Sequence, residues 1–378
     1  MRRPLVVSNR WVPSGTGTPI VLYELFRHFP PSSVTVFCGP GVHPASSLTL
    51  PFETRRLTLP KVDRYVYGAY RVLGKRALPL VRAALWRVIQ REKPTALYAH
   101  YPDAVFVTAA ALAAERAGIP LVVYFDILWE GNDEPGLAKR YEHRVVRTAS
   151  RRFAITEDYC EYLGQKHGVP FELMPHVLPT AQAELVIVPR EERTDAIHIG
   201  GNVYVNMNLD AVQRLHRVMA RRPAPPPLEI YGFTPRTELE KWGIRGDWVK
   251  TGTVQRHELL ALQRRSRVLY LPEAFESPTP QMIRYNFPTK ALEYMLTGTP
   301  ILVHAPADSY LARNAREHGW GLLVDRPDDE ALAAALQRLE AGGPEVDAMV
   351  HRAFEFARSR DGAVWSAKLM GALGVTPR

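Results

Sequence analysis

The chain has 378 residues, a length that suits two domains better than one, because single hydrophobic cores stop growing near roughly 250 to 300 residues. Apolar residues make up 46% of the sequence and aromatic residues 10%, which excludes an intrinsically disordered chain. The formal net charge of +9 suits an anionic ligand or an anionic membrane surface, and no nucleic-acid-binding motif accompanies it, so we expect no nucleic-acid partner.

The first half of the chain alternates short apolar runs with helical patterns. The predicted strands are Pro4–Ser8, Val34–Cys38, Ala96–Ala99, Leu121–Tyr124, Arg152–Ile155 and Glu172–Met174. The predicted helices are Thr18–His28, Tyr65–Arg91, Ala104–Ala117, Leu137–Thr148 and Glu157–Lys166, and Pro79 is expected to break the second of them. Strands that alternate with helices of this length predict parallel βαβ units.

A second alternating series follows the stretch Leu178–Thr194, which loses periodicity and carries the charge run Arg190–Arg193, as linkers do. Its predicted strands are Ala196–Ile199, Leu228–Tyr231, Trp248–Thr251, Val268–Leu271, Ile301–Val303 and Gly321–Val324. Its predicted helices are Leu209–Arg221, Arg256–Arg264, Lys290–Leu296, Ser309–His318 and Asp328–Glu340.

These two series predict an α/β protein with two Rossmann-like domains, at residues 1–185 and 186–350. The stretch Glu345–Leu373 reads as one or two helices and is left over after a complete second domain. We expect the final segment, 351–378, to form a helix that crosses back to the first domain.

The cysteines and the N-terminus indicate where the protein resides. Cys38 and Cys160 are too few for a disulfide framework and lack the spacing of a metal site. The N-terminal apolar run, Leu5-Val6-Val7, is too short for a signal peptide, and no apolar run approaches about 18 residues. We therefore expect a cytoplasmic protein without a membrane span.

The most informative segment runs from Phe287 to Pro300 with the sequence FPTKALEYMLTGTP. Pro288 presets a helix start, and the free N–H groups of the first turn, together with Lys290, offer a site for phosphate oxygens. Glu293 lies on the same helix face one turn further, where its carboxylate can accept hydrogen bonds from ribose hydroxyls. The alternative is a capped helix with a Lys290–Glu293 surface pair.

The pattern Pro-x-Lys-x-x-Glu-Tyr-Met-x-x-Gly-x-Pro resembles the nucleotide-binding helix of the GT-B glycosyltransferases, particularly the family 4 (glycosyl transferase group 1) enzymes. The resemblance implies two Rossmann-like domains that face a central cleft, with a ribose-binding glutamate at Glu293. It also implies transfer of a sugar from a nucleoside diphosphate sugar to an acceptor hydroxyl, with retention of configuration. The chain contains no Asp-x-Asp pair, so we expect neither a metal nor a cofactor besides the donor substrate.

The chain departs from the family pattern at two places. Family members usually carry a second glutamate eight positions before the first, and Tyr285 stands there. Glu273 and Glu276 lie upstream as candidate replacements. The family also often places an arginine and a lysine after the first turn of the second domain, where this chain has Val203–Asn208, so Lys290 and backbone donors are expected to hold more of the diphosphate charge.

In each predicted domain, one glycine-containing turn follows the first strand. In the first domain, Gly15 and Gly17 belong to the loop SGTGTP, and the resemblance places this loop at the donor diphosphate or the acceptor. In the second domain, Gly201 and Asn202 follow the strand, at the edge where open sheets bind ligands. For each, the alternative is an ordinary turn.

His100 and Asp126 are the candidate catalytic residues of the first domain, because each stands at the end of a predicted strand. His100 resembles a histidine that family members carry after the corresponding strand. Asp126 falls near a position where family members commonly carry a histidine or an aspartate close to the reacting centre. The alternative for both is a loop residue satisfied by local hydrogen bonds.

The region Lys61–Lys93 holds nine basic and two acidic residues among tyrosines and leucines. Such a basic amphipathic stretch can lie on an anionic membrane, which would suit a lipid-linked acceptor; the alternative is a solvated helix face. Two other functions remain open: a non-catalytic sugar-nucleotide-binding protein, and an epimerase or phosphorylase on the same fold.

Overall fold

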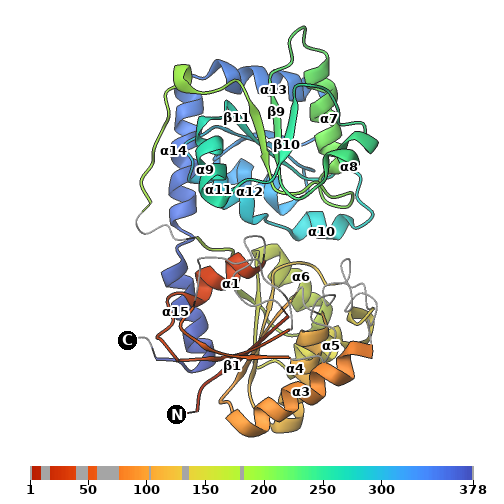
Figure 1. Ribbon diagram of the computed structural model, residues 1–378, viewed down its shortest axis with the longest axis vertical. Helices are drawn as coiled ribbons and strands as arrows, with labels where there is room; N and C mark the ends of the chain where they lie inside the picture. Colours follow the sequence, from red (N-terminus) through yellow and green to blue (C-terminus); the bar gives the residue numbers. More distant parts are fainter. Residues whose placement is uncertain are drawn as a thin grey trace. The chain divides into compact units, whose positions relative to one another are not determined.

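The computed structural model describes residues 2–9, 18–39, 50–57, 76–101, 104–129, 136–178 and 183–376. The chain divides into two compact units (Figure 1). The first unit contains Met1–Pro179 and Asp361–Arg378, and the second contains Thr180–Arg360. The chain therefore leaves the first unit, completes the second, and returns to the first for its last residues.

The described part of the first unit contains one parallel sheet with the strand order β3-β2-β1-β4-β5-β6-β7. Its strands are β1 Leu5–Ser8, β2 Thr35–Cys38, β3 Glu53–Arg56, β4 Leu97–Tyr101, β5 Leu121–Phe125, β6 Arg151–Ala154 and β7 Glu172–Leu173. All of these pairs are parallel, with β1 between β2 and β4 and with β4 in the centre of the sheet. The predicted α/β class is confirmed.

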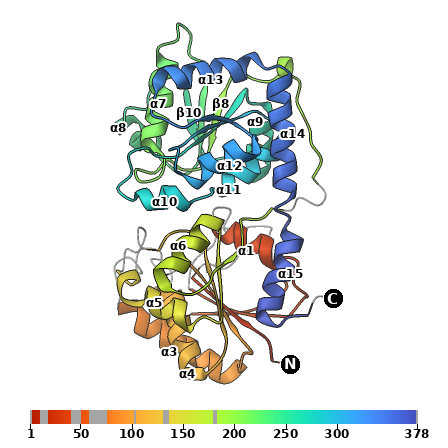
Figure 2. The ribbon, with the colours of Figure 1, turned by 180° about the vertical axis from the view of Figure 1, so that it is seen from behind.

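Helices cover both faces of this sheet. The described helices are α1 Thr18–Phe26, α3 Ala77–Glu92, α4 Ala104–Ala117, α5 Ala138–Thr148, α6 Glu157–His167 and α15 Gly362–Leu373. Helices α3, α4 and α5 pack side by side, and α15 packs with α1 on the opposite side of the sheet (Figures 1 and 2). The Ser366 hydroxyl donates to the Leu25 carbonyl, which anchors the returning helix to α1.

One expectation for this unit was wrong, and one strand was not predicted. Pro79 does not break a helix, because it is the third residue of α3. Backbone N–H groups in the first turn of a helix have no partner inside the helix, so the N–H that proline lacks costs no helical hydrogen bond there. Strand β3 was not predicted, since its sequence, Glu-Thr-Arg-Arg, has no apolar residue. It forms the sheet edge, where its charged side chains pair with residues such as Arg3 and Glu92.

The described part of the second unit contains a parallel sheet with the order β10-β9-β8-β11-β12-β13. Its strands are β8 Ile197–Gly200, β9 Leu228–Tyr231, β10 Val249–Gly252, β11 Val268–Pro272, β12 Ile301–His304 and β13 Leu322–Val324. Its helices are α7 Leu209–Ala220, α8 Arg236–Lys241, α9 Arg256–Arg265, α10 Pro280–Tyr285, α11 Thr289–Met295, α12 Tyr310–His318, α13 Asp329–Ala341 and α14 Pro344–Arg358. The short helices α8 and α10 were not predicted.

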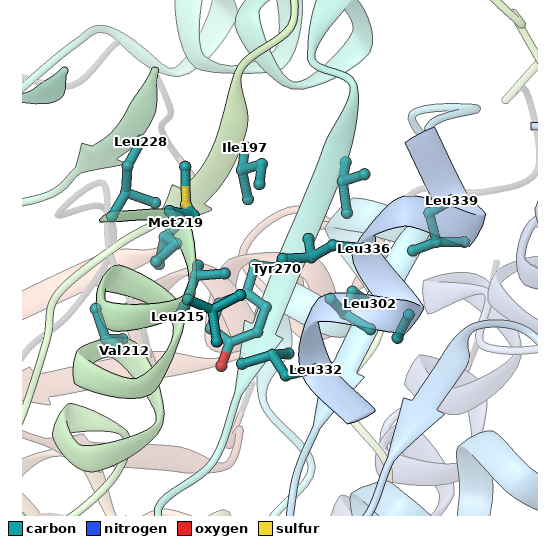
Figure 3. Close-up of a cluster of buried hydrophobic side chains, with 14 of the residues drawn as sticks. Ile197, Val212, Leu215, Met219, Leu228, Tyr270, Leu302, Leu332, Leu336 and Leu339 are labelled. Atoms are coloured by element: carbon teal, nitrogen blue, oxygen red, sulfur yellow. The ribbon is translucent and has the colours of Figure 1, made fainter. Parts of the chain in front are cut away.

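The core of the second unit lies between the sheet and helices α7 and α13 (Figure 3). Leu215 and Met219 of α7 and Leu336 of α13 are fully buried against strand residues such as Ile197. These side chains recur three or four residues apart on their helices, so one stripe of each helix faces the sheet. This packing fixes the carboxyl ends of the strands, from which the candidate site residues project.

Candidate functional site

Lys290 and Gly201, predicted from separate segments, come together at the carboxyl end of β8. Gly201 has a φ of +86°, and a Cβ atom added there would lie 3.0 Å from the Lys290 amine nitrogen. A side chain at this position would therefore be strained and would displace the lysine. Burial lowers the pKa of the Lys290 amine to about 8, and the charge of Glu293, one turn further along α11, opposes that shift.

Tyr294 of α11 fixes this helix against β8. The Gly200 backbone N–H donates a 2.6 Å hydrogen bond to the Tyr294 hydroxyl, and the ring is buried. The next N–H, of Gly201, donates to the Tyr231 carbonyl at the end of β9. Both glycine N–H groups are thus used inside the protein, so neither is available to bind an anionic ligand at this turn.

Asn202 braces two loops of the second unit. Its side-chain oxygen accepts a hydrogen bond from the Phe233 backbone N–H at 2.6 Å, and its side-chain nitrogen donates to the Tyr204 hydroxyl at 2.7 Å. The Asn202 amide was predicted to contact the ligand. The structure places it between the loop after β8 and the loop after β9, and its contact with a ligand stays a prediction.

The two candidate replacement glutamates have different surroundings. Glu273, directly after β11, is only 2% exposed, and it accepts a hydrogen bond from the Asn286 side chain at 3.3 Å. Burial raises the pKa of its carboxyl to about 8, against hydrogen bonds from Ser309 and Asn286 that favour the charged form. Glu276 is exposed, and its backbone N–H donates to Asp210 at 3.0 Å.

Glu276 therefore presents its carboxylate to solvent, whereas Glu273 keeps its carboxyl inside the unit. Tyr285, which stands at the position of the family glutamate, is the last residue of α10 and is half-buried.

His100 and Asp126, predicted separately, also come together. His100 lies on β4 and Asp126 directly follows β5, and the ladder between these strands pairs His100 with Tyr124. The His100 Nε2 atom lies 3.0 Å from an Asp126 carboxylate oxygen, and both residues are buried. The Tyr98 hydroxyl lies 3.4 Å from the other ring nitrogen of His100. An imidazole beside a carboxylate can hold and pass a proton.

Gly15 and Gly17 lie outside the described residues, as does the part of the basic stretch from 61 to 75. Within the described ranges, no group of three or more histidine, cysteine, aspartate or glutamate side chains is placed to hold a metal ion. In the same part of the chain, no helix is long and apolar enough to cross a membrane.

Tyr294 and Asn202 are the residues whose local roles the sequence did not reveal. Tyr294 belongs to the Phe287–Pro300 motif, so its position in the sequence was noted, but its hydrogen bond to Gly200 was not predicted. For Asn202 there was no signal in the sequence, because its partners Tyr204 and Phe233 come from two loops that are separated in sequence.

Two family models match the chain in succession. The glycosyl transferase 4-like domain matches residues 16–181, and the glycosyl transferases group 1 domain matches residues 174–341. Together the two ranges run from residue 16 to residue 341. No curated protein matches the chain by sequence.

Solved structures match nearly the whole chain at low sequence identity. Sucrose-phosphate synthase from Thermosynechococcus elongatus has a TM-score of 0.70 at 16% identity, over 99% of this chain and 98% of that one. Trehalose-6-phosphate synthase OtsA has a TM-score of 0.70 at 13% identity, over 100% of both chains. Anabaena Alr3699/HepE, in complex with UDP and glucose, has a TM-score of 0.69 at 14% identity, over 99% of this chain and 100% of that one.

These similarities confirm the GT-B fold and the resemblance seen in the α11 motif. The two domain models identify the order of the halves, and the structural matches extend the fold over the full chain. The chain therefore belongs to the GT-B glycosyltransferases, with a glycosyl transferase 4-like domain followed by a glycosyl transferases group 1 domain.

Proposed function

We propose that the second unit binds a nucleoside diphosphate sugar and that the first unit binds the acceptor hydroxyl, with no resident metal or cofactor. The observation that carries this proposal is the Lys290 amine against Gly201 at the carboxyl end of β8. Lys290 supplies the positive charge for the diphosphate, and Glu293 accepts hydrogen bonds from the ribose hydroxyls. Parallel sheets of this kind bind ligands at the carboxyl ends of their strands.

The donor is best sought first among UDP-sugars. Three of the similar structures are complexes of Alr3699/HepE that hold UDP, UDP and glucose, or UDP-glucose, and another is described as a UDP-forming trehalose-phosphate synthase. At sequence identities of 13 to 16%, these structures support the same fold for this chain, and the identity of its donor sugar has to be measured.

The reaction breaks the bond between the anomeric carbon and the diphosphate oxygen and forms a bond to the acceptor oxygen. The acceptor proton goes to the departing diphosphate, whose negative charge Lys290 stabilises. Asp126 accepts a hydrogen bond from the acceptor hydroxyl, and His100 holds the Asp126 carboxylate in place. We expect the transferred sugar to keep its anomeric configuration.

The acceptor is proposed to be lipid-linked, because α3 presents a basic and partly apolar face. Arg82 and Arg87 are exposed on this helix, and Leu80 is 52% exposed. The Arg116 guanidinium lies 4.0 Å above the half-buried Trp86 ring. Arginines together with exposed apolar groups suit the surface of an anionic bilayer.

The test is turnover of UDP-sugars by the purified protein, with and without a metal chelator. We expect release of UDP, faster when an acceptor is present, and product analysis that shows retention. Glu293→Gln should weaken UDP binding by about 1–3 kcal/mol, because a hydrogen bond to a charged group is lost. Equal UDP affinity of Glu293→Gln and the unmodified protein in calorimetry would exclude the ribose assignment.

The alternative of a binding protein without turnover is favoured by one observation, Tyr285 in place of the family glutamate. Such a protein would bind a nucleotide sugar and leave it intact after prolonged incubation. An epimerase would instead return an isomerised donor, and a phosphorylase would release a sugar phosphate. One analysis of the products separates all four outcomes.

A further inference from the structure

Two aromatic side chains are exposed beside the Lys290–Gly201 pair. Phe233, in the loop after β9, is 62% exposed, and Tyr204, in the loop after β8, is 50% exposed. Val205 next to Tyr204 is 56% exposed. Large apolar side chains that gather at the ligand-binding edge of a sheet are typical of a binding surface rather than of an ordinary surface.

These aromatic residues are held in place by hydrogen bonds. Asn202 accepts from the Phe233 backbone N–H and donates to the Tyr204 hydroxyl, so that one side chain joins both residues. A second link lies beside it, where the Val203 backbone N–H donates to the Thr234 hydroxyl at 2.9 Å. The rings are therefore presented by braced loops, which reduces the entropy lost when a ligand binds.

The same loops are joined to the proposed phosphate site. A Cβ atom added to Gly232, the neighbour of Phe233, would come within 2.5 Å of the Gly201 carbonyl carbon and oxygen. The loop carrying Phe233 thus packs directly on the turn whose other side contacts Lys290. A cation and two exposed aromatic rings share one edge, and the matching ligand has an anionic group and a flat ring.

We propose that Phe233 and Tyr204 form the stacking surface for the nucleobase of the donor, with Asn202 as the residue that positions them. This inference rests on the proposed function, because it takes the anionic group at Lys290 to be the diphosphate of a nucleotide. A base offers a flat π-face to either ring, and each stacked base adds measurably to affinity. The ring of a sugar acceptor is the other occupant that these side chains could take.

Calorimetry with UDP, GDP, ADP and inorganic pyrophosphate tests the assignment. The unmodified protein should bind at least one of the three nucleotides. Phe233→Ala should raise the Kd for that nucleotide by about five- to hundredfold, the range expected for losing one stacked base. The same substitution should leave the Kd for pyrophosphate unchanged. Phe233→Tyr should retain the affinity within about twofold, because tyrosine stacks equally well.

Two further variants separate stacking from a general effect on the fold. Asn202→Ala should also weaken nucleotide binding and leave pyrophosphate binding unchanged, because it removes the hydrogen bonds to the Phe233 N–H and the Tyr204 hydroxyl. Leu260→Ala, which removes an exposed apolar side chain from α9 of the same unit, should change neither affinity. The melting temperature of Phe233→Ala should match that of the unmodified protein, because the ring is exposed.

Each other outcome overturns the inference in a recognisable way. If the nucleotide binds equally well to Phe233→Ala, the base does not stack there. If only the KM for the acceptor rises, the aromatic pair serves the acceptor instead. If no nucleotide binds to the unmodified protein, the proposed function itself fails and this inference fails with it.

Discussion

The Gly200 backbone N–H donates its hydrogen bond to the Tyr294 hydroxyl, which ties the start of the glycine turn to helix α11. The bond is 2.6 Å long and buried, so α11 cannot move away from β8 without leaving a buried donor unsatisfied. The space beside Gly201, where the Lys290 amine lies, is therefore fixed in size.

Gly201→Ala should consequently displace Lys290. The added methyl would lie 3.0 Å from the amine nitrogen, at a φ of +86° that disfavours alanine. We expect the Kd for the nucleotide donor to rise about tenfold or more, as for the loss of a charged hydrogen bond. Gly371→Ala on α15, with no atom within 4 Å of its added Cβ, is the matched control and should bind the donor normally.

Donor affinity should also depend on pH through Lys290. Burial lowers the pKa of this amine to about 8, so it is cationic below that pH and loses its charge above it. Since the diphosphate remains anionic, we expect the Kd to rise about tenfold between pH 7 and pH 9.5. Lys290→Met should bind weakly at pH 7 and show no such rise; a flat profile for the unmodified protein would contradict the role given to Lys290.

The stability of the second unit should fall with rising pH because of Glu273. The pKa of its carboxyl is about 8 in the folded protein and 4.5 as the ordinary value, so between these values the unfolded chain is ionised while the folded chain keeps its proton. The folded state then binds more protons than the unfolded state, and its free energy of unfolding decreases as the pH rises from about 4.5 to 8.

Glu273→Gln should remove this dependence and stabilise the protein at pH 8 by about 1–4 kcal/mol relative to the native residue. Urea unfolding of both variants at pH 5 and pH 8, followed by tryptophan fluorescence, measures the difference. Glu276→Gln alters an exposed carboxylate nearby and should change stability little at either pH.

Membrane binding should depend on the exposed arginines of α3. Arg82→Gln with Arg87→Gln should lower binding to vesicles of anionic phospholipid about tenfold or more, because each basic residue near such a surface contributes about 1 kcal/mol. Sedimentation with the vesicles measures it. The control is Arg236→Gln with Lys241→Gln, an equal charge change on α8. Failure of the unmodified protein to sediment would refute the membrane contact.

Much of this architecture was predictable because the strands are continuous apolar runs and the helices are long enough to show their period. Strand β3 escaped prediction because it has only charged and polar residues, and α8 and α10 because six residues are too few to show a helical period. Pro79 was misinterpreted because its effect depends on its distance from the helix start, which the pattern alone did not fix.

The individual residues of the candidate site could be proposed from the sequence, but most of the contacts between them could not. Lys290 and Glu293 were recognised from the spacing of one motif. The contact of His100 with Asp126 depends on the pairing of β4 with β5, and the role of Asn202 depends on two loops meeting. Such contacts arise from tertiary packing, so local sequence patterns do not specify them.

The return of the chain to the first unit affects how the protein folds during synthesis. Helix α15 belongs to the first unit and packs on α1, although more than 300 residues separate Ser366 from Leu25 along the sequence. Every residue of the second unit is therefore synthesised before α15. The first unit, although most of it is encoded earlier, cannot complete its packing on α1 until α15 has been made.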